Sequence, residues 1–175
     1  KAWIHPYDWR SNKSPCYEQY CQSNIAIGTN SPNAQGWAYP MLFNTKNHWI
    51  MVTEAALDDT YCATHVKSDK SGLYTVVFAA KEEVAIPDDP EPMSQLPWAS
   101  PWRVIIIGDQ LADIIETSII QNLNPPSVIE DTDWIKPGRA AFSWWSDQPS
   151  TYDYEEQIKY IDFAADMGWE YILID

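Results

Sequence analysis

The sequence of 175 residues is poor in positive charge: 11 lysines and arginines stand against 25 aspartates and glutamates, a formal net charge of −14. Proteins that bind nucleic acids cluster lysine and arginine, and anionic membrane surfaces attract basic segments. The composition therefore argues against both partners. No apolar run approaches the roughly 18 residues that a membrane-spanning helix needs.

Cysteine is limited to Cys16, Cys21 and Cys62, which form neither a CxxC pair nor a metal-ligand spacing. A Cys16–Cys21 disulfide and three unlinked thiols fit equally well, so the redox compartment stays open. The three histidines are scattered, and the sequence has no GxSxG, P-loop or dinucleotide-binding motif. The chain begins at Lys1 without a signal peptide, which we expect of a processed protein or a segment of a longer one.

Tryptophan and tyrosine are abundant, with ten of each against four phenylalanines. Both side chains combine a flat apolar face with a polar atom, so they suit core edges and binding surfaces. Composition alone leaves two interpretations of about equal weight. The rings fill a core, or they line a surface that stacks on sugar rings.

The first two thirds of the chain predict β-structure. Tyr39–Phe43 and Trp49–Thr53 flank an Asn-Thr-Lys-Asn turn and predict a hairpin. Leu73–Ala80 is rich in β-branched residues and predicts another strand. Five prolines within residues 87–101 predict a long surface loop. The apolar run Arg103–Ile107 then predicts a buried strand.

A helix should follow this strand, because Asp109 can cap it and apolar residues recur at helical spacing up to the Asn-Pro-Pro segment at 124–126. The chain then changes character at about residue 130.

The last third predicts a βαβ unit. Ala140–Trp145 is the first strand, and Ser150 or Thr151 caps a helix of about 16 residues that ends near Gly168. Tyr171–Asp175 is apolar on both faces, which is typical of a parallel strand covered by helices. Lys136 and Arg139, ahead of the unit, are expected to anchor the linker by exposed ion pairs that contribute about 0 to 1 kcal/mol.

Four segments follow one another in the order and spacing of a known family: "PWRVIIIGD", "QNLNPPS", "DTDWIKPGRAAFSWWSD" and "IDFAADMGWEYILID". Over Tyr39 to Asp175 the chain resembles glycoside hydrolase family 97, a family of bacterial α-glucosidases and α-galactosidases. Several motifs agreeing in order make the resemblance specific.

The resemblance implies a multidomain β and α/β protein: an N-terminal β-super-sandwich, a catalytic (β/α)8 barrel and a smaller C-terminal β-domain. Residues 1–102 then belong to the later part of the sandwich. Residues 103–133 form a strand, a helix and a linker, and residues 134–175 begin a truncated barrel. The catalytic carboxylates are expected beyond Asp175.

Glu54 is the sharpest single candidate for a site residue. It shares a strand face with Ile50 and Val52, and a carboxylate on an apolar face must be paired, protonated or bound to a metal. Taken alone, it also fits a glutamate at the rim of a strand. The resemblance matches Thr53-Glu54-Ala55 to a family segment whose glutamate is a Ca²⁺ ligand. Calcium takes six to eight oxygens, so one carboxylate cannot hold it.

Four further residues are expected to contact substrate. Asp147 and Asp175 follow the first two barrel strands, and the carboxyl ends of barrel strands face the active site. Asp175 also fits a loop carboxylate or a helix cap. Trp144 and Trp145 alternate along the predicted strand, so only one of them can be a sugar platform.

The function that the resemblance implies is a calcium-dependent, exo-acting α-glucosidase or α-galactosidase that cleaves oligosaccharides. A periplasmic or secreted bacterial location is expected. The alternative is a non-catalytic carbohydrate-binding β-sandwich, which would explain the aromatic residues. The predicted βαβ unit argues against that alternative, because a binding sandwich has no use for it.

Overall fold

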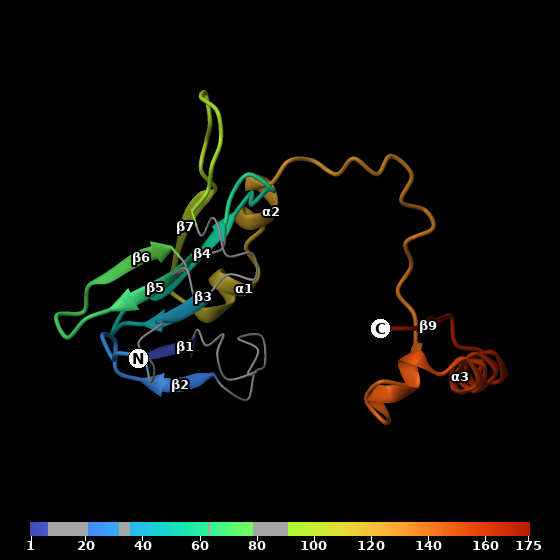
Figure 1. Cartoon of the computed structure of the whole chain (residues 1–175). Helices are drawn as coiled ribbons and strands as arrows, with labels where there is room; N and C mark the ends of the chain where they lie inside the picture. The colour runs from blue at the N-terminus through green and yellow to red at the C-terminus, as the bar shows by residue number, and fades with distance from the viewer. Residues whose placement is uncertain (7–20, 32–35, 63, 79–90) are drawn as a thin grey trace. The chain divides into compact units, whose positions relative to one another are not determined.

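The computed structural model describes residues 1–6, 21–31, 36–62, 64–78 and 91–175 (Figure 1). The chain forms two units, Lys1–Pro126 and Ser127–Asp175, and each is described by itself. The strand and the helix predicted between residues 103 and 126 lie in the first unit. The Cys16–Cys21 pairing falls outside the described residues. No helix in the described ranges is long and apolar enough to cross a membrane.

The described part of the first unit is built on a seven-stranded antiparallel sheet (Figure 1). Its main path runs β2-β1-β3-β4-β7, while β5 pairs with β3 and β6 pairs with β5. The strands are β1 (Ala2–Pro6), β2 (Gln22–Ile25), β3 (Trp37–Asn44), β4 (Trp49–Ala55), β5 (Thr64–Ser68), β6 (Tyr74–Phe78) and β7 (Trp102–Gly108).

The predicted hairpin is confirmed as β3 and β4, paired from Met41 with Val52 to Asn44 with Trp49. Thr45 closes the turn because its hydroxyl donates to the His48 carbonyl at 3.0 Å and accepts from the His48 amide at 3.0 Å. The turn chemistry thus fixes the register of the hairpin.

The sheet forks at β3. The end of β3 pairs with β4, whereas Trp37 at its start pairs with Val66 of β5. Trp37 is fully buried, and its indole nitrogen donates to the Ser68 hydroxyl at 3.0 Å. One core cluster gathers around this fork: Ala2, Ile4, Trp37, Met41, Phe43 and Val66.

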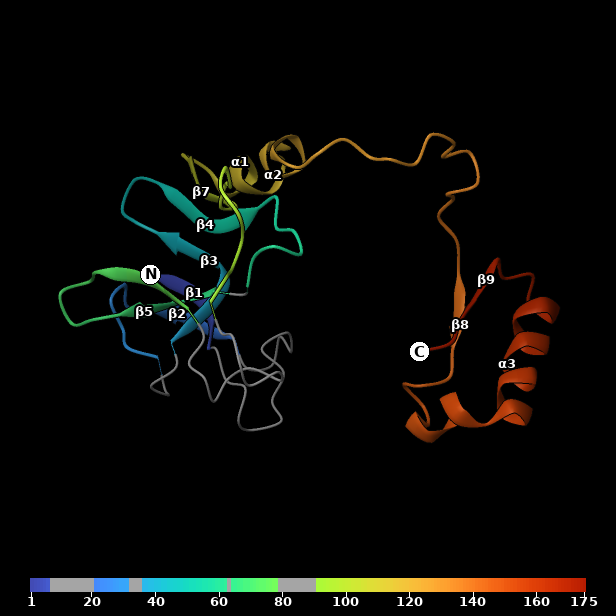
Figure 2. The same cartoon turned by 45° about the horizontal axis from the view of Figure 1, so that its top comes forward.

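Two short helices lie beside β4 and β7 (Figure 2): the first contacts both strands and the second contacts β4. They are α1 (Leu111–Ile115) and α2 (Ile119–Leu123). Ile114 of α1 packs in a second core cluster with Ala55, Val104 and Ile106. The helices therefore cover the face of β7 that carries Val104 and Ile106.

Three predictions for this region need correction. The single helix is two, separated at residues 116–118. The N-cap is Gln110, whose main-chain N–H donates to Asp113 Oδ2 at 2.9 Å. Asp109 Oδ1 instead lies 3.0 Å from His48 Nδ1, in hydrogen-bond contact. The strand Arg103–Ile107 exists but is buried on one face only: Ile105 and Ile107 are 64% and 63% exposed.

The second unit confirms the βαβ prediction. Strands β8 (Ala140–Phe142) and β9 (Tyr171–Leu173) are parallel and joined through the 3-10 helix η3 (Gln148–Tyr152) and α3 (Tyr154–Asp166). The cap of α3 is Asp153, which accepts from the Glu156 amide, and not Ser150 or Thr151, which lie in η3. Gly168, with a φ of +63°, follows the helix as predicted.

The linker ahead of β8 is hydrogen-bonded to Glu170, the residue before β9, and to Tyr171, the first residue of β9. The Arg139 amide donates to Glu170 Oε2 at 2.8 Å, and the Tyr171 hydroxyl donates to the Lys136 carbonyl at 2.7 Å. These main-chain contacts carry the anchoring that the sequence assigns to side-chain ion pairs, although Arg139 also pairs with Glu170 at 3.4 Å. The Arg139 amide holds the pKa of Glu170 below its usual value.

Gly36→Ala should lower the free energy of unfolding of the chain far more than Gly72→Ala. A Cβ on Gly36, at a φ of +108°, would lie 2.4 Å from the Val66 carbonyl oxygen and push β3 from β5. Gly72 has a φ of +84° with open space beside it among the described residues, so alanine there meets only backbone strain of about 1 kcal/mol.

For Gly36→Ala we expect a loss of about 3 kcal/mol or more, measured by urea unfolding. Equal losses for the two variants would contradict the close approach of β3 and β5.

Candidate functional site

Glu54 lies opposite Arg103 where β4 pairs with β7. The Arg103 guanidinium stands 2.8 Å from Glu54 Oε1, and the Thr64 hydroxyl donates to the same oxygen at 2.7 Å. The Glu54 side chain is only 8% exposed. Of the three states predicted for a carboxylate on this apolar face, the described residues provide the first, an ion pair.

Aromatic rings extend this ion pair toward the loop ahead of β7. Arg103 Nη2 donates to the Tyr61 hydroxyl at 2.7 Å, and its guanidinium lies 5.4 Å from the centre of the Tyr61 ring. Trp98 stacks on Tyr61 at 5.8 Å and donates from its indole nitrogen to Thr60. The sequence gives no sign of this cluster, because its members come from three separate segments.

Tyr39 responds to the same charges. Burial raises the pKa of its hydroxyl, and the nearby negative charge of Glu54 raises it further, while Arg103 opposes the effect. Charge and burial at this end of the sheet therefore favour a neutral Tyr39 beside the Glu54–Arg103 pair.

The described residues around Glu54 do not form a complete calcium site. The described residues contain no group of three histidine, cysteine, aspartate or glutamate side chains that could hold a metal ion. Glu54 supplies one carboxylate, and a guanidinium already bonds it. Because calcium needs six to eight oxygens, the residues that the structure describes do not hold the ion by themselves.

The other four candidates lie in the second unit, at the carboxyl end of its parallel strands. Phe142 and Leu173, the last residues of β8 and β9, are register partners. Asp147 lies five residues after Phe142 and Asp175 two after Leu173, and both are exposed. The two carboxylates thus follow the same end of the strand pair.

The alternation predicted for Trp144 and Trp145 is wrong, because β8 ends at Phe142 and both tryptophans lie in a turn. Both rings neighbour Phe142. Trp144 is half-buried and stacks on it at 6.1 Å, with the planes 7° apart. Trp145 is 85% exposed and tilted against it at 6.2 Å. Of the two, Trp145 offers the freer ring.

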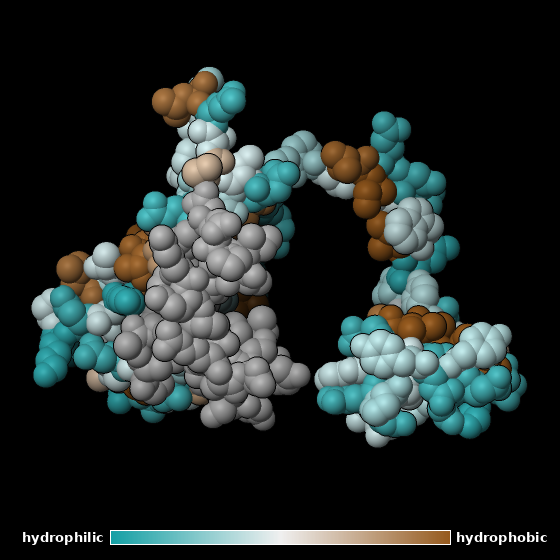
Figure 3. Space-filling model, viewed as in Figure 1, coloured by the Kyte–Doolittle hydropathy of each residue, from teal (hydrophilic) through white to brown (hydrophobic). Residues whose placement is uncertain are grey.

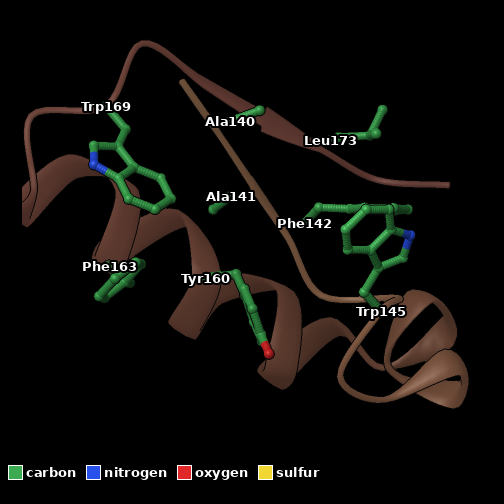
Figure 4. A pocket seen from close by; sticks show the side chains of 8 residues that line it. All are labelled: Ala140, Ala141, Phe142, Trp145, Tyr160, Phe163, Trp169 and Leu173. Carbon is green, nitrogen blue, oxygen red and sulfur yellow. The ribbon is translucent and has the colours of Figure 1, made fainter. Parts of the chain in front are cut away.

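Trp145 also lines an apolar groove of about 530 Å³ between α3 and the two strands (Figure 4). Tyr160 and Phe163 reach the groove from α3, and Trp169 from the segment before β9 (Figure 4). Apolar surface is also visible on the second unit in Figure 3. The groove is lined by Ala140, Ala141, Phe142, Trp145, Tyr160, Phe163, Trp169 and Leu173.

Both units have counterparts in known proteins. The model of the glycosyl-hydrolase 97 N-terminal domain matches residues 1–126. A probable retaining α-galactosidase from Streptomyces bingchenggensis is 28% identical over 99% of this chain and 25% of its own length. A retaining α-galactosidase from Bacteroides thetaiotaomicron is 34% identical over 82 residues, 43% of this chain and 12% of that protein.

Solved structures agree. The crystal structure of a β-arabinopyranosidase matches with a TM-score of 0.80 and 31% identity, covering 99% of this chain and 28% of that one. A family 97 enzyme of Pseudoalteromonas sp. strain K8, bound to acarbose, matches with a TM-score of 0.58 and 25% identity over 79% of this chain and 22% of its own.

The chain spans about a quarter of the length of these full-length relatives. The domain match over residues 1–126 accounts for the antiparallel first unit, and the longer alignments continue through the second. The chain belongs to glycoside hydrolase family 97.

Proposed function

We propose that this chain is part of an exo-acting α-glycoside hydrolase that removes galactose or glucose from oligosaccharides, in the periplasm or outside a bacterial cell. The observation that carries the proposal is the domain match over residues 1–126, followed by a βαβ unit. The names of the relatives make α-galactoside the first substrate to test.

The second unit supplies the features that suit a sugar. In (β/α)8 enzymes substrates meet the carboxyl ends of the strands, where Asp147 and Asp175 follow β8 and β9. The exposed ring of Trp145 presents a flat face on which a pyranose can stack, and carboxylates accept hydrogen bonds from hydroxyl groups. On this proposal the unit begins the catalytic barrel, and its residues bind and orient sugar.

The cleavage itself needs a proton donor for the leaving oxygen and a second carboxylate, as attacking group or base. We assign neither role to a residue of this chain. The two curated relatives are named retaining enzymes, which supports the covalent route for the whole protein. The non-catalytic binding module stays the weaker candidate, because the βαβ unit adds nothing to a binding sandwich.

Calcium enters as a hypothesis for the whole enzyme, with Glu54 as the ligand that this chain would supply. When bound, such an ion stabilises negative charge and orients substrate. Its remaining oxygens would have to come from outside the described residues, and Glu54 would have to share its carboxylate with Arg103.

The full-length protein that carries this sequence should hydrolyse p-nitrophenyl α-galactoside or α-glucoside, and a chelator should reduce the rate. Release of nitrophenol measures the activity, and added calcium should restore it. Absence of hydrolysis with both substrates would leave the binding module as the better description.

Glu54→Gln in the full-length protein should raise the calcium concentration needed for half-maximal hydrolysis, because the variant loses a charged ligand. Glu116→Gln, an exposed carboxylate at the end of α1, serves as the matched control. An unchanged calcium requirement in the Glu54 variant would remove this residue from the metal site.

A double-mutant cycle tests the ion pair separately. Arg103→Met should lower the free energy of unfolding by about 2 kcal/mol, because it leaves the buried Glu54 carboxylate without its cation. Adding Glu54→Gln should recover part of this loss, since the buried charge disappears with its partner. Urea unfolding measures both, and strictly additive losses would mean that the two side chains do not interact.

A further inference from the structure

The turn that carries Trp144, Trp145 and Asp147 is held from α3 by polar side chains. It starts at Ser143 and reaches Ser150, and both serines are only 2% exposed. Within the turn, the Ser143 carbonyl accepts from the amides of Ser146 and Asp147, each at 3.0 Å. The turn is thus closed at its start by its own main chain.

Gln157 of α3 joins the two ends of this turn. Its side-chain nitrogen donates to the Ser143 hydroxyl at 2.8 Å and to the Ser150 carbonyl at 2.8 Å. The carbonyl can only accept, so the nitrogen of the amide, not its oxygen, must face Ser150. One side chain, 6% exposed, therefore fixes the span from Ser143 to Ser150.

Tyr160, one turn further along α3, holds the middle of the same segment. Its hydroxyl lies 2.6 Å from Ser146 Oγ, which in turn donates to the Ser143 carbonyl at 2.9 Å. A serine hydroxyl carries one proton, so Tyr160 is the donor of the first bond. Gln157 and Tyr160 are three residues apart and share a helix face.

The cost of burying an amide indicates what these contacts do. A buried polar group costs free energy unless it is hydrogen-bonded, and the side-chain oxygen of Gln157 is buried with no hydrogen-bond partner among the described residues. An apolar side chain of similar size could fill the same space without that cost. Gln157 adds what leucine cannot, namely two directed bonds that set where the turn leaves the strand. These two hydrogen bonds therefore define the position of the turn relative to α3, which apolar packing alone would not do.

We infer that Gln157 is a positioning residue for substrate binding, acting through the turn that presents Trp145 and Asp147. The inference rests on the proposed function of that turn. Gln157 itself touches no sugar: it holds the main chain on which the exposed ring and the carboxylate are displayed. A displaced turn should weaken substrate binding more than it slows bond cleavage.

Gln157→Leu in the full-length protein tests this, with p-nitrophenyl α-galactoside and α-glucoside as substrates. We expect KM to rise about fivefold, which corresponds to the net free energy of about one hydrogen bond. The value of kcat should change less than about twofold. A merely structural role would reduce the folded fraction, which lowers kcat and leaves KM unchanged. Gln121→Leu, the same exchange at an exposed position of α2, is the control and should leave both values unchanged.

Ser143→Ala removes only one of the two bonds and keeps the helix intact, so it covers the case in which Gln157→Leu does not fold. It should raise KM in the same direction by a smaller factor. A KM within twofold of the wild-type value in the variants that fold would overturn the inference. Absence of activity in the wild type would instead count against the proposed function, so the two failures are distinguishable.

Discussion

Main-chain pairing along β3 is the constraint on which the first unit depends. Three strands are hydrogen-bonded to it. β1 pairs along one edge of β3. On the other edge, β4 pairs with the C-terminal part of β3 and β5 pairs with its first residue. The buried Trp37 marks the point where β5 joins, and Gly36 just before it leaves room for the Val66 main chain. Removing this strand from its place would separate the remaining sheet into pieces.

Each unit also buries polar side chains that join segments distant in sequence. In the first, Glu54 meets Arg103 and Thr64, so that β4, β7 and β5 converge on one carboxylate. In the second, Gln157 meets Ser143 and Ser150, so that α3 holds both ends of a turn. Buried polar groups demand partners with defined geometry, whereas apolar contacts tolerate sliding. In both units, apolar packing supplies the bulk of the core and a polar group selects one arrangement.

The sequence predicted correctly those elements that depend on residues close to one another in the chain. The β3–β4 hairpin follows from its turn residues, and the βαβ unit from a change of hydrophobic period between α3 and β9. The errors lie where a distant partner decides. Asp109 lies one residue before the cap and bonds His48 instead. One face of β7 is exposed because the helices cover only the other. The Tyr61–Trp98–Arg103 cluster and the early end of β8 depend likewise on contacts that no sequence window contains.

The pairing of β4 with β7 has a consequence for the order of folding. The hairpin of β3 and β4 closes over a short turn, whereas β7 reaches β4 only after residues 56–101 have been looped out, and long loops cost more entropy to close. Local hairpins form on a microsecond scale, ahead of such distant pairings. Before β7 pairs with β4, Glu54 lacks the Arg103 guanidinium that bonds it in the folded sheet. The pairing of β7 with β4 that completes this part of the sheet is therefore also what brings a cation to the Glu54 carboxylate.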